Sequence, residues 1–213
     1  MLTTADVVYY AIYLLSLVFS FKAREASIPG LKFIRLMLLA GLGAEAVVEY
    51  LQFSGVDDTP PYYLYIPFEY WCLAKFYKRN TTSRFLRKAL DISLWVYMIG
   101  AAAISIWYHG LSGYPSALYN VNCFLNTIWI AFLLFNLNKG HRREIWNHPL
   151  FIISSALLIF FAGVFFFNPA YSYIQHKHPI QAQNLRTIIN TGLNYILYIL
   201  LSYGFLCSAK TVK

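Results

Sequence analysis

Long apolar stretches, separated by short polar connections, run along the whole chain. A helix needs about 20 apolar residues to cross the hydrocarbon core of a bilayer, and about 17 at the least. Seven stretches approach or reach that length, at residues 7–21, 33–53, 61–77, 89–108, 117–137, 150–167 and 187–207. The pattern therefore predicts an all-α fold, a polytopic transmembrane bundle of seven helices that forms one domain over residues 1–213.

The composition agrees with this pattern. Hydrophobic residues make up 59% of the chain and charged residues 12%, whereas a soluble domain has about 25% charged residues. Seven membrane spans also leave almost no residues for a soluble domain. We expect a multi-pass protein of a cell membrane, with the lipid bilayer as its main partner.

Lys and Arg are confined to alternate connections. Of the 17 basic residues, all except Lys177 and Arg186 lie in or within a few residues of the connections that follow the first, third and fifth stretches, or after the seventh. Short basic connections stay in the cytoplasm, so we predict the N-terminus outside and the C-terminus in the cytoplasm. The formal net charge of +8 then follows from topology. We predict no nucleic-acid partner, but attraction of the basic connections to anionic lipid headgroups and contact with a cytoplasmic signalling partner or a second copy of the chain.

Polar side chains at membrane depth form the candidate site. Three of the predicted helices carry a pair of acids or amides at i, i+4, a spacing that places both members on one face. The third predicted helix adds one acid with two tyrosines along the same stripe. The candidate ligand-binding or ion-binding residues are Glu45, Glu49, Glu69, Tyr62, Tyr65, Asn122, Asn126, Asn190 and Asn194. Because polar groups in a membrane usually face the bundle interior, we expect them to line one cavity open to the outside.

The two kinds of polar residue leave different alternatives open. Glu45 and Glu49 lie one turn apart and repel each other when both are ionised, so we expect at least one of them to be protonated. The asparagines have a structural alternative, because amides also tie membrane helices together through hydrogen bonds that average about 0.6 kcal/mol.

Motifs for catalysis or cofactor binding are absent from the sequence. No G-x-G-x-x-G, phosphate-loop, H-E-x-x-H or G-x-S-x-G pattern occurs, and we therefore predict no catalytic residues and no cofactor. The three cysteines lie in different spans and are expected to be packing residues. An HxH pair at residues 176–178, which His109 would have to complete as a metal site, lies in a predicted external connection over residues 168–186, and we predict no metal there.

Two further expectations concern single positions. Asp91 follows Arg87 by four residues, which suits either an ion pair on one helix or an acid in the first turn that the helix dipole favours. The sixth stretch has only Ser154 and Ser155 as polar residues, so we expect it to face lipid or a partner.

Three segments resemble parts of small seven-helix membrane proteins of bacteria: YIPFEYWCLAKFY (65–77), HPLFIISSALLIFFAGVFFFN (148–168) and LNYILYILLSYGFLC (193–207). That group has no established activity, and some members are thought to lie beside sensor kinases. The resemblance covers most of the chain in the arrangement of its helices, but only these segments in amino-acid sequence. It implies a bacterial inner-membrane origin and no particular chemistry.

Three hypotheses for function follow. The first is a non-enzymatic sensor or receptor-like module, in which an outward-facing polar cavity binds a small ligand or proton and the basic connections engage a partner. The second is a small transporter or channel subunit that uses Glu45, Glu49 and Glu69 as a proton or cation relay. The third is a membrane-embedded enzyme that modifies lipid, although no matched set of His, Asp or Ser supports it.

Overall fold

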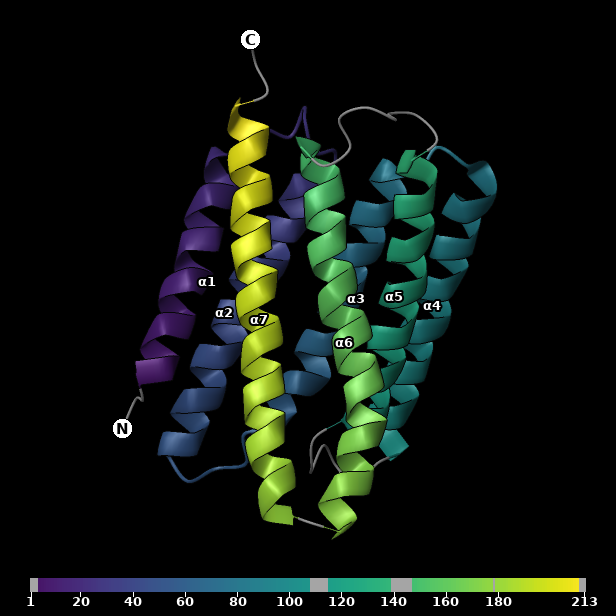
Figure 1. Cartoon of the computed structure of the whole chain (residues 1–213). Helices are drawn as coiled ribbons and strands as arrows, with labels where there is room; N and C mark the ends of the chain where they lie inside the picture. The colour runs from purple at the N-terminus through teal and green to yellow at the C-terminus, as the bar shows by residue number, and fades with distance from the viewer. Residues whose placement is uncertain (1–3, 108–114, 139–146, 178, 211–213) are drawn as a thin grey trace. The chain divides into compact units, whose positions relative to one another are not determined.

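The computed structural model describes residues 4–107, 115–138, 147–177 and 179–210, and all their long elements are α-helices. The helices are α1 (Thr4–Lys22), α2 (Leu31–Phe53), α3 (Pro60–Asn80), α4 (Arg84–Trp107), α5 (Ser116–Asn138), α6 (Pro149–Lys177) and α7 (Pro179–Lys210) (Figure 1). Each predicted stretch lies within one of these helices, apart from residue 108, which lies outside the described residues. The all-α prediction is confirmed, and no strand occurs in the part of the chain that the structure describes.

Four of the described helices are long and apolar enough to cross a membrane. They are α4 over Arg84–Trp107, α5 over Ser116–Leu137, α6 over Pro149–Pro169 and α7 over Thr187–Ala209. By length and composition, these four support a membrane protein. Helix α3 is less apolar, because tyrosines, prolines, Glu69 and Lys75 interrupt its apolar residues.

The chain divides into two compact units. Unit 1 contains residues 1–28 and 123–213, and unit 2 contains residues 29–122. Helix α5 therefore contributes its first residues to unit 2 and the remainder to unit 1. The single domain over residues 1–213 stays a prediction, and each unit is described by itself below.

In unit 1, α7 packs against both α1 and α6 (Figure 1). Helices α1 and α7 run in the same direction: the rings of Tyr13 and Tyr198 lie 4.5 Å apart between centroids, and the Arg24 backbone N–H, just past the end of α1, donates to Ser208 Oγ at 3.2 Å. Helix α6 runs the opposite way, since Gly204 near the end of α7 lies against Ile153 near the start of α6.

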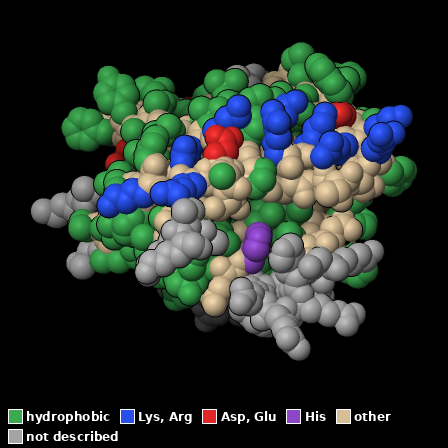
Figure 2. Space-filling view, turned by 90° about the horizontal axis from the view of Figure 1, so that it is seen from above, with side chains coloured by type: hydrophobic (Ala, Val, Ile, Leu, Met, Phe, Trp, Pro, Cys, Tyr) green, Lys and Arg blue, Asp and Glu red, His purple; other side chains and the backbone are tan. Residues whose placement is uncertain are grey.

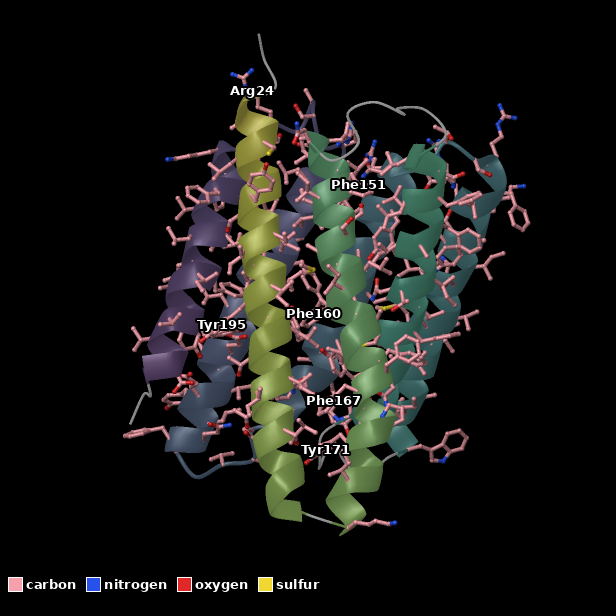
Figure 3. All side chains as sticks on the ribbon, in the orientation of Figure 1. Arg24, Phe151, Phe160, Phe167, Tyr171 and Tyr195 are labelled. Carbon is pink, nitrogen blue, oxygen red and sulfur yellow. The ribbon has the colours of Figure 1, made fainter. Side chains whose placement is uncertain are left out.

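Helix α6 provides much of the apolar core of unit 1. Figure 3 shows Phe151, Phe160 and Phe167 spaced from one end of α6 towards the other, and the last two are buried. Ser154 is also fully buried. The expectation that this stretch faces lipid or a partner stays a prediction, since Ile159 and Phe166 on the same helix are exposed.

Helices α6 and α7 extend beyond the apolar stretches that predicted them. They contain 29 and 32 residues, which corresponds to about 44 and 48 Å at 1.5 Å per residue, more than the ~30 Å hydrocarbon core. The predicted connection over residues 168–186 is therefore largely helical. Its polar residues continue the two helices past the length that a bilayer covers, and Pro169 lies inside α6.

In unit 2, α3 packs against α2 and α4. The end of α3 lies beside the start of α2, where Asn80 Nδ2 donates to the Pro29 carbonyl at 2.7 Å. Gly30 precedes α2 with φ of 80°, in the left-handed region that glycine adopts without strain. Helix α4 is antiparallel to α3, because Tyr70 lies against Tyr97 with ring centroids 4.5 Å apart, while Lys78 meets Asp91.

Candidate functional site

Glu69 is the best-defined polar residue of the predicted site. It lies on the inner side of α3 with 7% of its surface exposed, and Asn122 near the start of α5 is fully buried. Asn122 Nδ2 donates to Glu69 Oε2 at 2.7 Å, and the Tyr65 hydroxyl donates to Glu69 Oε1 at 3.3 Å. Three predicted site residues from two helices of unit 2 thus meet in one cluster, which we call the Glu69 cluster.

The Glu69 cluster can hold its carboxyl group in either charge state. An amide N–H can only donate, so Oε2 remains the acceptor for Asn122 whether or not Glu69 carries a proton. A hydroxyl both donates and accepts, so the bond between Oε1 and Tyr65 can reverse when Oε1 is protonated. The geometry therefore suits a group that gains or loses a proton without moving its neighbours.

Neighbouring aromatic residues hold α3 and α4 in place around this cluster. The Tyr70 hydroxyl and Ser93 Oγ lie 2.5 Å apart, and the Tyr97 hydroxyl donates to the Leu118 carbonyl at 3.2 Å. These bonds connect α3 to α4, and α4 to the start of α5. The position of Asn122 relative to Glu69 is consequently fixed by three helices.

Towards the end of α3 that carries Lys78, the buried side chains are mostly apolar, with Tyr77 among them. Cys72, Leu73 and Phe76 are all fully buried. The described residues of α3 thus supply no further carboxylate or amide between Glu69 and this basic end. Such packing favours a closed polar cluster over a continuous polar route along α3.

The other acids of the prediction lie differently. Glu49 on α2 is exposed, and Glu45 is half-buried with one carboxylate oxygen, Oε2, inaccessible to solvent. Tyr62 is half-buried near the start of α3. Of the two carboxylates predicted to face the interior, Glu45 is thus partly buried and Glu49 is exposed. Residues four apart on a helix point in slightly different directions, and here the edge of the buried face lies between the two.

The remaining asparagines belong to unit 1. Asn126 on α5 is fully buried, whereas Asn190 and Asn194 on α7 are half-buried. Asn194 Nδ2 donates to the backbone carbonyl of Asn190 at 2.9 Å, so this amide is bonded within its own helix. The shared cavity predicted for residues of both units stays a prediction.

A second polar feature of unit 2 was not predicted from the sequence. A cavity of about 450 Å³ is lined by Phe33, Trp71, Lys75, Lys78, Arg79 and Arg87; we call it the basic pocket. Three helices contribute to it, and Lys and Arg side chains gather on the end face shown in Figure 2. The sequence of α3 contains a pattern that could have indicated this pocket, because Trp71, Lys75 and Arg79 recur every four residues and so share one face.

The ion pair of Asp91 is part of the same region. Lys78 Nζ lies 2.6 Å from Asp91 Oδ2, and Arg87 Nε instead donates to the Thr81 carbonyl at 2.7 Å. The prediction that Arg87 pairs with Asp91 was wrong, because Lys78 of the neighbouring helix α3 forms the ion pair with this carboxylate. Sequence spacing along one helix does not report such contacts between helices.

The described cysteines and histidines form no candidate metal-binding group. Cys72, Cys123 and Cys207 are free thiols, the first two buried, and the described ranges contain no group of three or more possible metal ligands. His109 and His178 lie outside the described residues, and the side chain of His176 is not described either.

Comparisons with known proteins do not assign a function, so the function must be inferred from the site. None of the protein-family models, curated proteins or solved structures compared with the chain matches it. The fold and the composition define a helical protein with membrane-spanning character.

Proposed function

We propose that this protein is a seven-span bacterial inner-membrane sensor module, with its N-terminus outside and its C-terminus in the cytoplasm, in which the Glu69 cluster responds to a proton or a small ligand. The observation that carries the proposal is a carboxyl group buried in a helical core and hydrogen-bonded to Asn122 and Tyr65. An ionisable group in such a place is expensive and usually functional.

The distribution of basic residues within each unit supports this orientation. In unit 2, the start of α2, the end of α3 and the start of α4 share one end, which carries Lys32, Lys78 and Arg87. In unit 1, the ends of α1 and α7 meet where Arg24 contacts Ser208. Since basic residues collect on the cytoplasmic side, both ends are cytoplasmic in the proposed topology.

Helix α3 is the element that would pass a change at Glu69 to the cytoplasm. It carries Glu69 in its buried middle and Lys78 in its last turns, and Lys78 is paired with Asp91 on α4. A change in the bond between Glu69 and Asn122 alters the packing of α3, and the α3–α4 connection, where Thr82 is exposed, then presents the change to a partner. The packed segment of Cys72, Leu73 and Phe76 favours this role over transport.

The test combines infrared spectroscopy with a label at the cytoplasmic end. A spin label at exposed Arg84 (R84C, with the native cysteines replaced by serine or alanine) reports the α3–α4 connection in bicelles as pH is varied. We expect a carboxyl infrared band and the label mobility to change together, and both changes to vanish in Glu69→Gln. Glu49→Gln is the matched control, because Glu49 is exposed, and should preserve both changes.

Two outcomes would overturn the sensor assignment. If the label and the carboxyl band are insensitive to pH and to added small cations in both the parent and Glu69→Gln, the cluster is structural. If proteoliposomes show a proton or cation flux that Glu69→Gln abolishes, the protein is a transporter and the second hypothesis replaces the first.

A further inference from the structure

The basic pocket is a distinct feature of unit 2, separate in its residues from the Glu69 cluster. Its cations come from α3 (Lys75, Lys78 and Arg79) and α4 (Arg87), and its aromatic wall from Phe33 on α2 and Trp71 on α3. The volume of about 450 Å³ lies within the range of roughly 300–1,000 Å³ typical of small-molecule sites.

The charges in the basic pocket are only partly balanced. Asp91 neutralises Lys78 at 2.6 Å, and Arg87 uses its Nε for the Thr81 carbonyl. Lys75 and Arg79 make no ion pair with any described residue. A surplus of positive charge in a partly enclosed site is a recognised arrangement for phosphate, which Arg can bind through two parallel hydrogen bonds.

The first carbons of the Arg79 side chain pack against the residue that precedes α2. A Cβ added to Gly30 would lie 3.2 Å from Arg79 Cβ and 3.3 Å from Arg79 Cγ, so the aliphatic part of Arg79 packs against this glycine. Arg79 as a whole is exposed and lines the basic pocket, so a ligand can reach its guanidinium.

The aromatic lining of the basic pocket comes from Phe33 and Trp71. Phe33 and Trp71 meet edge to face with ring centroids 5.7 Å apart, and Phe68 stacks on Trp71 at 5.8 Å. Trp at the boundary between lipid and water is typical of membrane proteins. A ligand that matches both the basic and the aromatic lining has an anionic head and an apolar body.

We propose that the basic pocket binds the phosphate headgroup of an anionic glycerophospholipid of the inner leaflet, with the lipid's apolar part against Trp71 and Phe33. This proposal rests on the proposed orientation, in which this end of unit 2 lies at the cytoplasmic surface. It assigns one defined binding site to the general attraction between the basic connections and lipid headgroups. A free phosphate compound shares the anionic chemistry but lacks the apolar part.

The experiment measures lipid retained by the purified protein in detergent, by native mass spectrometry, after titration with phosphatidylglycerol or phosphatidylcholine. We expect selective retention of phosphatidylglycerol, and a loss of affinity of about tenfold or more in Lys75→Gln/Arg79→Gln, since each basic residue contributes about a factor of five near an anionic lipid. The control Arg84→Gln/Lys88→Gln removes the same charge at the same end from exposed residues outside the pocket. It should change affinity by less than about threefold.

The outcomes separate the possibilities. Equal losses in the pocket variant and the control would mean diffuse attraction and would overturn the site, as would unchanged retention in the pocket variant. Displacement of bound lipid by inorganic phosphate or glycerol 3-phosphate at equal concentration would overturn the lipid assignment in favour of a free anion. The single variant Lys75→Gln controls for misfolding, because Lys75 makes no hydrogen bond or ion pair with any residue that the structure describes. It should show part of the loss of affinity.

Failure of this proposal is distinguishable from failure of the sensor proposal. Lipid retention in detergent does not require Glu69, so Glu69→Gln should retain phosphatidylglycerol as the parent does. If Glu69→Gln changes no pH response but phosphatidylglycerol is retained selectively, only the sensor proposal is overturned. If the label at position 84 responds to pH but phosphatidylglycerol is not retained selectively, only the lipid-site proposal is overturned.

Discussion

Asn122 and Asn194 occupy similar sequence contexts, each a member of an i, i+4 pair in an apolar helix, yet they are used differently. Asn194 in unit 1 donates to the carbonyl of Asn190 one turn back on its own helix, whereas Asn122 in unit 2 donates to Glu69 on another helix. The contrast extends to other side chains. In unit 1, Thr127 and Ser202 also bond to backbone carbonyls of their own helices.

Unit 2 relies more on polar bonds from helix to helix. Tyr70 pairs with Ser93, and Lys78 with Asp91. In unit 1 the helices approach closely where glycine leaves room: a Cβ on Gly204 would come within 2.8 Å of Ile153 Cγ1. Close backbone approach at small residues is a common way to pack membrane helices. The two units thus illustrate two ways of joining helices, and in unit 2 the polar one includes the buried carboxyl group of Glu69.

The largest effect should come from replacing Asn122. Asn122→Leu removes the donor to Glu69 Oε2 and leaves a buried carboxyl oxygen unsatisfied, and it should lower the free energy of unfolding by about 2–3 kcal/mol. The matched variant Asn194→Leu removes a bond within one helix and should lower it by about 0.6 kcal/mol or less. Reversible unfolding in mixed micelles measures both. Equal effects would remove the distinction between the two amides.

Much of the fold was predictable from the sequence, and the site was predictable only in part. Apolar length predicted the seven helices because each stretch must satisfy its own backbone hydrogen bonds. Residues 168–186 were assigned to a connection because polarity was taken to end a helix, although a helix can continue past the bilayer. Four-residue spacing placed Glu69 and Tyr65 on one stripe, and the structure joins them to Asn122.

What the sequence could not provide is the partner across a helix interface. Nothing in the spacing distinguishes Asn122 from Asn194, or indicates that Asp91 pairs with Lys78 instead of Arg87. Such choices depend on the rotation of each helix about its axis, which follows from the packing of all its neighbours. For the same reason the basic pocket, built from three helices, was not predicted although its α3 residues are regularly spaced.

A smaller effect should come from filling the close approach in unit 1. Gly204→Ala places a Cβ 2.8 Å from Ile153 Cγ1, and because Ile153 is fully buried and branched, it has little room to move. We expect a loss of about 1–2 kcal/mol in the free energy of unfolding. Gly192→Ala on the same helix meets no atom within 4 Å and should be neutral or slightly stabilising. Gly163→Ala should lie between them, since the atoms it meets are the flexible end of Leu193.

The smallest effect concerns the connection between α2 and α3, where unit 2 also uses a local bond. The Thr59 hydroxyl and backbone N–H donate to Asp57 Oδ1 at 2.7 and 3.0 Å, and these bonds hold the pKa of Asp57 below its usual value. A lowered pKa in the folded state stabilises the fold above the unfolded pKa of about 3.9, and this stabilisation is lost as pH falls through the folded pKa.

Asp57→Asn keeps an acceptor for Thr59 but removes the charge, so the parent should lose stability more steeply than the variant as pH falls below about 4. Thermal unfolding in bicelles over a series of acidic pH values measures the difference. Thr59→Val, which removes only the hydroxyl donor, should weaken the same pH dependence and retain part of it. Parallel pH profiles for the parent and Asp57→Asn would mean that the hydrogen bonds of Thr59 do not favour the ionised carboxylate, and the connection would then contribute to unit 2 only through its backbone geometry and the prolines that begin α3.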